Sequence, residues 1–196
     1  MPEPDAPAAE EPARKPAAPL QLVGLGLVVV FLETSGPFDI FANPAGWLLV
    51  LLGTAKLPLG QRGLLAGLGF VAFVIAVPLW FPAVHEPLLG ADPSLDWAAK
   101  LPTYGYCFLL CRALMAAAQP VHPSGYVRFA TLSVLLAVSV AVPPVAIAAD
   151  SSWVANAGIA LIVATQVWLI WSLFSHSRRP YADAPAATTA TSNGHD

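Results

Sequence analysis

Residues 20–59, LQLVGLGLVVVFLETSGPFDIFANPAGWLLVLLGTAKLPL, form an almost continuous apolar run that decides the fold of this chain. A single helix of this length would extend about 60 Å, twice the thickness of the hydrocarbon core of a bilayer. The run must therefore break, and two short segments mark the break. Ser-Gly-Pro at 35–37 interrupts a helix, and Asn43 followed by Pro44 begins one. The run predicts a hairpin of two membrane-spanning helices.

Four further apolar stretches follow this hairpin, and each is long enough to cross a bilayer as a helix. Proline pairs and polar gaps set their limits. Pro143 and Pro144 should end the fifth helix, because proline lacks a backbone N–H and clashes with the preceding turn. The expected helices cover about residues 20–35, 44–57, 63–81, 93–119, 126–142 and 153–175.

Composition supports the same class of protein. Of the 196 residues, 57% are hydrophobic and only 11% are charged, which is too apolar for an ordinary soluble domain. We therefore expect an all-α, polytopic transmembrane bundle of six helices over residues 20–175. The segment 1–19, rich in Pro, Ala and Glu, and the polar segment 176–196 are expected to be disordered tails. The net charge of −3 argues against a nucleic-acid partner.

The charged residues alternate between the gaps that separate the apolar stretches. Cations occupy every second gap, and the remaining gaps are acidic apart from Lys100. Because Lys and Arg in short loops stay on the cytoplasmic side, this alternation predicts six crossings with both termini in the cytoplasm, in the inner (plasma) membrane of a bacterium. Tryptophans at 47, 80, 97 and 153 are expected at the outer interface, as part of an aromatic belt. The cations on the predicted cytoplasmic side are Arg14, Lys15, Lys56, Arg62, Arg128, Arg178 and Arg179.

Small residues four positions apart are expected to let helices pack closely, because helices in lipid associate through close backbone approach. These faces either hold the bundle together within one chain or form the seam of a homodimer. The partners expected are therefore the lipid bilayer and, as an open alternative, further copies of the chain or other membrane proteins. The small residues concerned are Gly63, Gly67, Ser133, Ala137, Ala141, Ala160 and Ala164.

Arg112 is the most unusual polar residue of the predicted membrane domain. A guanidinium group within a membrane helix is unfavourable by several kcal/mol unless it is paired or reaches water. By the predicted topology, Arg112 lies at about the depth of Gln166 on the last helix, so the two side chains are expected to form a contact. The alternatives are snorkelling of Arg112 toward the headgroups and a site for a substrate or lipid headgroup.

Acidic residues and thiols provide two further hypotheses. Glu33 and Asp39 lie in the short first connection, at the membrane boundary. A carboxylate is energetically unfavourable there, which makes both residues candidates for a functional role. No metal motif, nucleophile elbow or phosphate-binding loop is present, so we expect no catalytic residue, no metal and no cofactor. Cys107 and Cys111 share a helix face, and packing is the expected role, because thiols four apart on a helix are poorly placed to bond.

The segment 38–49, FDIFANPAGWLL, resembles a signature of uncharacterised small multi-pass bacterial membrane proteins. In that signature a segment like Asp-Ile-x-Pro-Asp-x-x-Gly-Trp/Tyr-Leu opens a transmembrane helix. Asn43-Pro44 stands near the position of Pro-Asp in the pattern, and the family provides no activity to carry over. The resemblance implies a structured hairpin corner made by Asp39, Asn43, Pro44, Gly46 and Trp47.

Two functions from different classes remain open at this point. The leading hypothesis is a non-catalytic structural, assembly or accessory component of the membrane. The alternative is a small-solute or ion permease, or a permease subunit, that uses Arg112, Gln166 and the corner formed by Glu33 and Asp39. A permease should direct its polar residues into a common interior cavity, whereas a scaffold should have a dry core with Arg112 at the headgroups. An enzyme should bring Glu33 or Asp39 close to His85 or Glu86.

Overall fold

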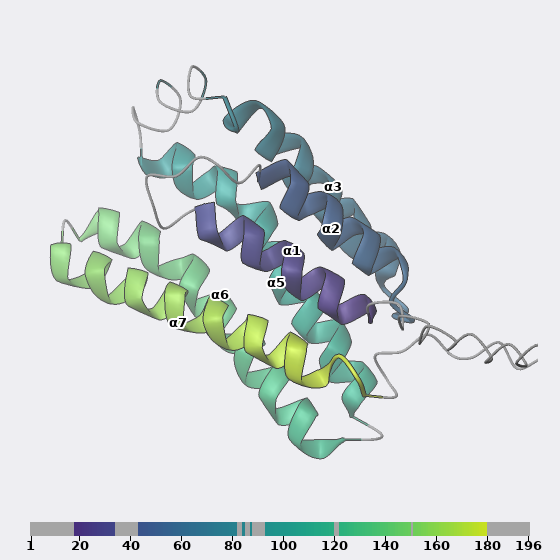
Figure 1. Ribbon diagram of the computed structural model, residues 1–196. Coiled ribbons are helices and arrows are strands. Elements are labelled where there is room, and N and C mark those ends of the chain that lie inside the picture. Colours follow the sequence, from purple (N-terminus) through teal and green to yellow (C-terminus); the bar gives the residue numbers. More distant parts are fainter. Residues whose placement is uncertain are drawn as a thin grey trace, which may run out of the picture.

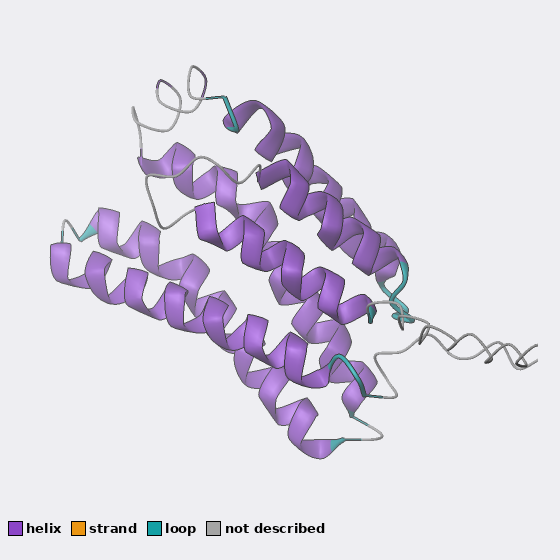
Figure 2. Cartoon of the chain, viewed as in Figure 1, coloured by secondary structure: helices purple, strands orange, loops and turns teal. Residues whose placement is uncertain are grey.

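The computed structural model describes residues 18–33, 43–81, 84, 87, 93–119, 122–149 and 151–179. Over these residues the chain is entirely helical and contains no strand (Figure 2). The all-α class and the six helices expected from the apolar stretches are therefore confirmed. Both tails lie largely outside the described ranges, so their disorder stays a prediction. The helices are α1 (Pro19–Glu33), α2 (Asn43–Ala55), α3 (Arg62–Leu79), α5 (Pro93–Ala118), α6 (Pro123–Ala148) and α7 (Ser152–His176).

The helices form a closed ring in chain order (Figure 1). Within the described part of the chain, each helix packs against the helix before it and the helix after it, and α7 packs against α1 to close the ring. Neighbouring helices run antiparallel because each connection reverses the chain. The ring thereby encloses a core of Leu, Val and aromatic side chains contributed by all six helices.

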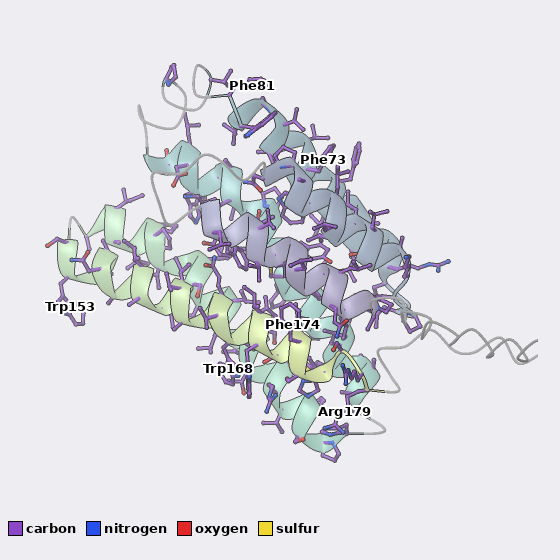
Figure 3. The ribbon with its side chains drawn as sticks, viewed as in Figure 1. Phe73, Phe81, Trp153, Trp168, Phe174 and Arg179 are labelled. Atoms are coloured by element: carbon purple, nitrogen blue, oxygen red, sulfur yellow. The ribbon has the colours of Figure 1, made fainter. Side chains whose placement is uncertain are left out.

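The outer surface of this ring is apolar. Four helices, α3, α5, α6 and α7, are long and apolar enough to cross a membrane, and α1 is a shorter apolar helix. Large apolar side chains cover the exterior, including Phe81, which is 52% exposed, and Trp153, which is 77% exposed (Figure 3). An apolar exterior of this extent is characteristic of a protein solvated by lipid rather than by water.

The tightest packing in the ring lies between α1 and α2, where glycines bring two backbones together. A Cβ atom built on Gly26 would lie 2.5 Å from the carbonyl oxygen of Gly46 and 2.8 Å from the backbone nitrogen of Val50. A Cβ atom on Gly53 would lie 2.9 Å from the carbonyl oxygen of Pro19. Because only glycine permits such an approach, these glycines fix α1 against α2.

The small residues singled out from the sequence do not form this seam. Gly63 and Gly67 have no heavy atom within 4 Å of a Cβ built on them, and both are exposed. Ser133 is buried, but the four alanines at 137, 141, 160 and 164 are exposed. The prediction that these faces hold the bundle together within one chain is therefore wrong for all but Ser133. The spacing was right for close packing, but spacing does not reveal which helix face points inward.

The fifth expected helix does not end at residue 142. Instead, α6 continues through Pro143 and Pro144 to Ala148, and the prediction of a stop at the proline pair is wrong. Pro144 has no N–H to donate to the carbonyl of Val140, four residues earlier. The indole nitrogen of Trp97, on α5, donates to that carbonyl at 3.1 Å. A neighbouring helix therefore satisfies the acceptor that the proline leaves free, and the helix continues.

One end of the ring carries the cations, and we call it the basic end. Lys56 and Arg62 flank the connection between α2 and α3, and Arg178 and Arg179 follow α7. A hydrogen bond of 3.3 Å from Gln21 to Ser177 ties the start of α1 to the end of α7 at this same end. The alternation read from the sequence thus corresponds to one end of the folded ring. Its cytoplasmic orientation stays a prediction.

Arg128 shows how this end is built. It lies near the start of α6, with its guanidinium group 4.7 Å from the ring centroid of Trp171 on α7. The same group donates a hydrogen bond of 3.2 Å to Ser175. A cation stacked on an aromatic ring and bonded to a hydroxyl is suited to the boundary between lipid and water.

Candidate functional site: a polar cavity inside the ring

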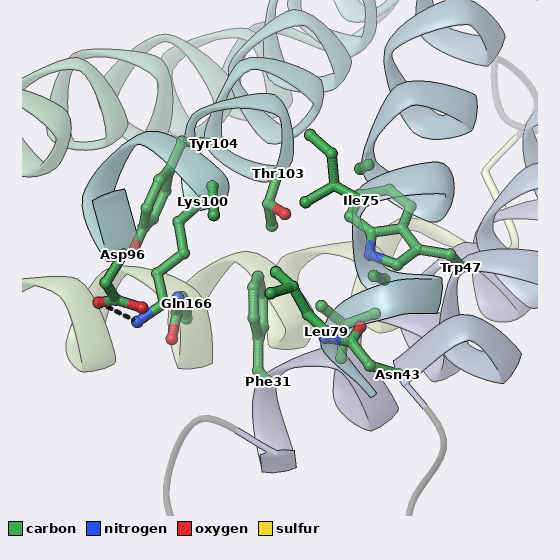
Figure 4. A pocket seen from close by; sticks show the side chains of 14 residues that line it. Phe31, Asn43, Trp47, Ile75, Leu79, Asp96, Lys100, Thr103, Tyr104 and Gln166 are labelled. Atoms are coloured by element: carbon green, nitrogen blue, oxygen red, sulfur yellow. Dashed lines mark hydrogen bonds and ion pairs between the residues drawn. The ribbon is translucent and has the colours of Figure 1, made fainter. Parts of the chain in front are cut away.

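A cavity of about 300 Å³ lies inside the ring, in the half away from the basic end. This volume is at the lower limit of the range for small-molecule sites. Five helices line it, and the residues come from the end of α1, the start of α2, the last turns of α3, the first half of α5 and the middle of α7 (Figure 4). Its polar lining residues are Asn43, Asp96, Lys100, Thr103, Tyr104 and Gln166, and its larger apolar ones are Val30, Phe31, Trp47, Ile75 and Leu79.

The polar wall of the cavity follows one face of α5. Asp96, Lys100, Thr103 and Tyr104 are separated by four, three and one residues, and residues at such spacings share a helix face. Lys100 donates to Asp96 at 2.7 Å, and both side chains retain about 40% exposure, at 40% and 38%. Figure 4 shows this ion pair next to Gln166, which reaches the same side of the cavity from α7.

The opposite wall holds an unused acceptor. Asn43, at the start of α2, lines the cavity, and its side-chain carbonyl oxygen is buried without a hydrogen-bond partner among the residues that the structure describes. A buried acceptor left unpaired is unfavourable by about 1 to 3 kcal/mol. Figure 4 places Asn43 and Trp47 across the cavity from the ion pair. The cavity thus presents an ammonium and a carboxylate to whatever occupies it, and the buried oxygen of Asn43 lies in its wall.

A packed layer lies directly behind the cavity, on the side of the basic end. Trp47 contacts Tyr106 edge to face, with ring centroids 5.5 Å apart. The Thr54 hydroxyl donates to the carbonyl of Val50 at 2.7 Å, so its single proton is used, and the Tyr106 hydroxyl donates to Thr54 at 2.7 Å. Trp47, Thr54 and Tyr106 are at most 1% exposed. The layer therefore closes the cavity toward the basic end.

This layer corrects the expected position of Trp47, which was assigned to the outer aromatic belt. Trp47 is fully enclosed, and the prediction of an interfacial position is wrong. Trp80 and Trp153, at 44% and 77% exposure, lie on the outside as an aromatic belt requires. Trp47 lies one residue beyond Gly46, about 100° round α2, so that with Gly46 packed against α1 the indole contacts Tyr106 on α5 inside the ring.

Arg112 and Gln166, expected to be in contact, are not joined by any hydrogen bond, although the structure describes both residues. Gln166 lines the cavity, whereas Arg112 is exposed on the outside of α5. Arg112 follows Thr103 by nine residues, which turns it about 180° round the helix and moves it about 13 Å along the axis. Its exposed position favours the snorkelling alternative.

The remaining residues singled out from the sequence fall into two groups. Asn43, Pro44, Gly46 and Trp47 make up the first turns of α2, where they pack against α1 or line the cavity. Glu33 is the last residue of α1, and Asp39 lies outside the described residues, as do His85 and Glu86. The corner formed by Glu33 and Asp39 therefore stays a prediction.

The two cysteines lie in the dry half of the core. Cys107 and Cys111 are free thiols with no exposed surface, packed among Leu110, Leu114 and Leu169. Neither residue lines the cavity. In the part of the chain that the structure describes, no group of three or more His, Cys, Asp or Glu residues is arranged to hold a metal ion.

Sequence reasoning missed the ion pair of the cavity, although a signal was present. Lys100 is the single cation in the gaps on the acidic side, and Asp96 precedes it by four residues, the spacing of a helical ion pair. The pair was read as part of a solvated outer face because nothing in the sequence placed it inside a ring.

Comparisons of the chain with protein-family models, with curated proteins and with solved structures gave no match. The class of the protein therefore follows from the fold alone. An all-helical ring with four helices able to cross a bilayer and an apolar exterior is the architecture of a multi-pass membrane protein.

Proposed function

We propose that this protein is a non-catalytic component of the bacterial inner (plasma) membrane that binds a small polar solute in the cavity inside the ring. The observation that carries the proposal is the gathering of an ammonium, a carboxylate and two amides around one cavity in an otherwise apolar bundle. Polar groups inside a membrane domain are unfavourable and are typically functional. With both termini in the cytoplasm, as the charge alternation favours, the cavity faces the outer side.

A binding role without catalysis is the version of this proposal that the lining supports best. Asp96 is the only carboxylate among the described lining residues, and it is held in an ion pair with Lys100. The lining offers recognition groups instead: donors, acceptors and aromatic surface.

Transport is the second candidate, and the position of the cavity favours it. The cavity lies between helices, in the half of the bundle away from the basic end. The layer of Trp47, Thr54 and Tyr106 bounds it on the side of the basic end. A solute permease in an outward-facing state has this arrangement of a site above a closed barrier. In this version the conducting residues are Asn43, Lys100 and Gln166, and Arg112 takes no part.

The proposal also covers the partners of the protein and its family. The bilayer is the principal partner, and the exposed small residues at 137, 141, 160 and 164 offer a face on which a second copy or another membrane protein packs. Nucleic acid is not a partner. Membership of the uncharacterised small multi-pass bacterial family that residues 38–49 resemble belongs to the same proposal.

The test is direct binding by the full-length protein in detergent or nanodiscs. A library of small polar solutes is screened by thermal stabilisation and by the fluorescence of Trp47. Ala76→Phe fills the cavity, and Ala164→Phe places the same ring on the lipid-facing side of α7. We expect a stabilising solute whose effect is lost in Ala76→Phe and kept in Ala164→Phe. Equal responses in both variants would refute binding in the cavity.

A second pair of variants tests which polar residues contribute. Gln166→Leu removes an amide from the cavity lining, and Arg112→Leu removes the exposed cation outside the ring. We expect solute binding to weaken in Gln166→Leu and to be unchanged in Arg112→Leu. Uptake into proteoliposomes then separates the two candidate functions, because only a permease moves the bound solute across the membrane.

A further inference from the structure

We infer that the solute is a zwitterion, in which a cationic and an anionic group lie close together, attached to an apolar part. This inference rests on the proposed binding function and specifies its ligand class. The juxtaposition that carries it is the ion pair of Lys100 and Asp96 on one wall, with aromatic and aliphatic side chains on the other.

Charge balance selects the ligand class. The described lining carries one ammonium and one carboxylate, so its formal charge is zero. A simple cation or anion binding in the cavity would add a net charge beside an ion pair that is already balanced, at a site partly lined by apolar side chains, and this is unfavourable. A zwitterion adds no net charge. Each of its two ionised groups meets an opposite charge in the pair of Lys100 and Asp96, and these contacts compensate its desolvation.

The ion pair has hydrogen-bonding capacity left for such a ligand. Lys100 has three N–H donors, and within the described part of the chain it uses one of them, in the hydrogen bond to an oxygen of Asp96. The carboxylate of Asp96 accepts several hydrogen bonds through its two oxygens. A ligand carboxylate can therefore bind Lys100 while a ligand ammonium binds Asp96. The result is a square of alternating charges in which each contact is a charge-assisted hydrogen bond.

The rest of the lining describes the other part of the ligand. Phe31, Trp47, Ile75 and Leu79 provide an aromatic and aliphatic wall, which favours an apolar substituent. The side chain of Asn43 lies in the same wall. An α-amino acid with an apolar side chain has both the paired charges and the apolar part that this cavity accommodates.

The experiment compares probes that differ in charge and share a shape. Phenylalanine is the zwitterion, phenethylamine the cation, 3-phenylpropionate the anion and 2-phenylethanol the neutral probe. The other apolar α-amino acids are titrated beside them. Binding to the full-length protein in nanodiscs at pH 7 is measured by calorimetry and by Trp47 fluorescence. We expect at least one zwitterion to bind 10-fold or more tightly than its cationic and anionic analogues.

Two variants then test whether Lys100 and Asp96 recognise the charged groups of the ligand. Asp96→Asn frees the ammonium of Lys100, and Lys100→Gln frees the carboxylate of Asp96. Each should weaken zwitterion binding by about 10- to 100-fold, the typical effect of losing a charge-assisted hydrogen bond. In addition, Asp96→Asn should gain affinity for the anionic probe, and Lys100→Gln for the cationic probe. Loss of fold cannot produce such opposite preferences.

Lys56→Gln, at the basic end, is the matched control and should change neither affinity nor preference. If the anion or the cation binds wild-type protein as tightly as the zwitterion, the inference is wrong, although cavity binding stands. If the neutral probe alone binds and Ala76→Phe blocks it, the inference is likewise wrong, although cavity binding stands. If no probe of any charge binds, the zwitterion inference is overturned; the proposed solute-binding function falls with it only if the solute library also gives no ligand that Ala76→Phe excludes.

Discussion

The close approach of α1 and α2 makes Gly26→Ala the sharpest test of the ring. The added methyl group would lie 2.5 Å from the carbonyl oxygen of Gly46, about 0.9 Å short of an ordinary contact at 3.4 Å. The nearest atoms also include the backbone nitrogen of Val50 at 2.8 Å. Because backbone atoms cannot rotate away as a side chain does, the two helices must separate by nearly 1 Å.

The expected loss of stability follows from the side-chain contacts between α1 and α2 that this separation weakens. Val23, Leu27 and Val50 have no exposed surface, and Val30 is 5% exposed. A gap of 0.5 to 1 Å removes a quarter to a half of the dispersion energy of each contact that it opens. Overpacking of this kind typically lowers the free energy of unfolding by about 1 to 3 kcal/mol. At about 2 to 4 °C per kcal/mol for a chain of this size, we expect a melting temperature about 2 to 12 °C below that of the wild type.

The assay is thermal unfolding of the purified protein in one detergent, followed by intrinsic fluorescence. Gly67→Ala is the matched control, because a Cβ on Gly67 meets no atom within 4 Å. Gly53→Ala should resemble Gly26→Ala, since its Cβ would lie 2.9 Å from the carbonyl oxygen of Pro19. A melting temperature of Gly26→Ala within about 1 °C of the Gly67→Ala value would refute the proposed seam.

Three further predictions test other parts of the structure. Tyr106→Phe removes the hydrogen bond to Thr54 beneath the cavity, and we expect a loss of about 1 kcal/mol, which an unchanged melting curve would contradict. Cys107 and Cys111 are fully buried, so a thiol reagent should label them only after denaturation; rapid labelling of folded protein would show that this core opens. Reporter fusions at the amino and carboxyl ends should both report the cytoplasm, and opposite compartments would exclude the topology read from the charges.

The helical hairpin at the start of the chain illustrates what sequence reasoning predicts well. Its existence follows from one length comparison, because the apolar run is twice as long as a bilayer is thick. The start of α2 at Asn43 follows from local chemistry, because the pair Asn43-Pro44 favours a helix start in any context. Such properties depend on neighbouring residues alone, so they survive without knowledge of the fold.

The fate of the proline pair illustrates what such reasoning misses. Pro143 and Pro144 remove backbone donors, and local rules predict a helix end there. The helix continues because the indole of Trp97, more than 40 residues away in sequence, donates to the carbonyl of Val140. A contact between α5 and α6 thus overrides the local preference. No window of sequence around residue 143 contains the information needed.

The candidate site divides along the same line. Gln166 was singled out through its depth in the membrane, as the expected partner of Arg112. Its expected partner, Arg112, lies on the outside of α5, whereas Asp96 and Lys100 lie inside. Counting residues along a helix gives approximate depth, but the rotation of each helix about its axis decides which side chains meet. That rotation is set by packing against neighbouring helices.

By itself, the sequence determined the class of protein, the number of apolar helices and the gaps in which cations gather, because these depend on hydrophobicity, helix length and local charge. Only the tertiary structure decided that the helices close into a ring, that Gly26 and Gly46 form its tightest seam, and that Lys100 and Asp96 face a cavity shared with Gln166. The physical reason is that lipid and helix interiors are similarly apolar, so hydrophobicity hardly distinguishes the inward face of a membrane helix from its outward face. Close backbone packing makes that choice, and it exists only once the helices have met.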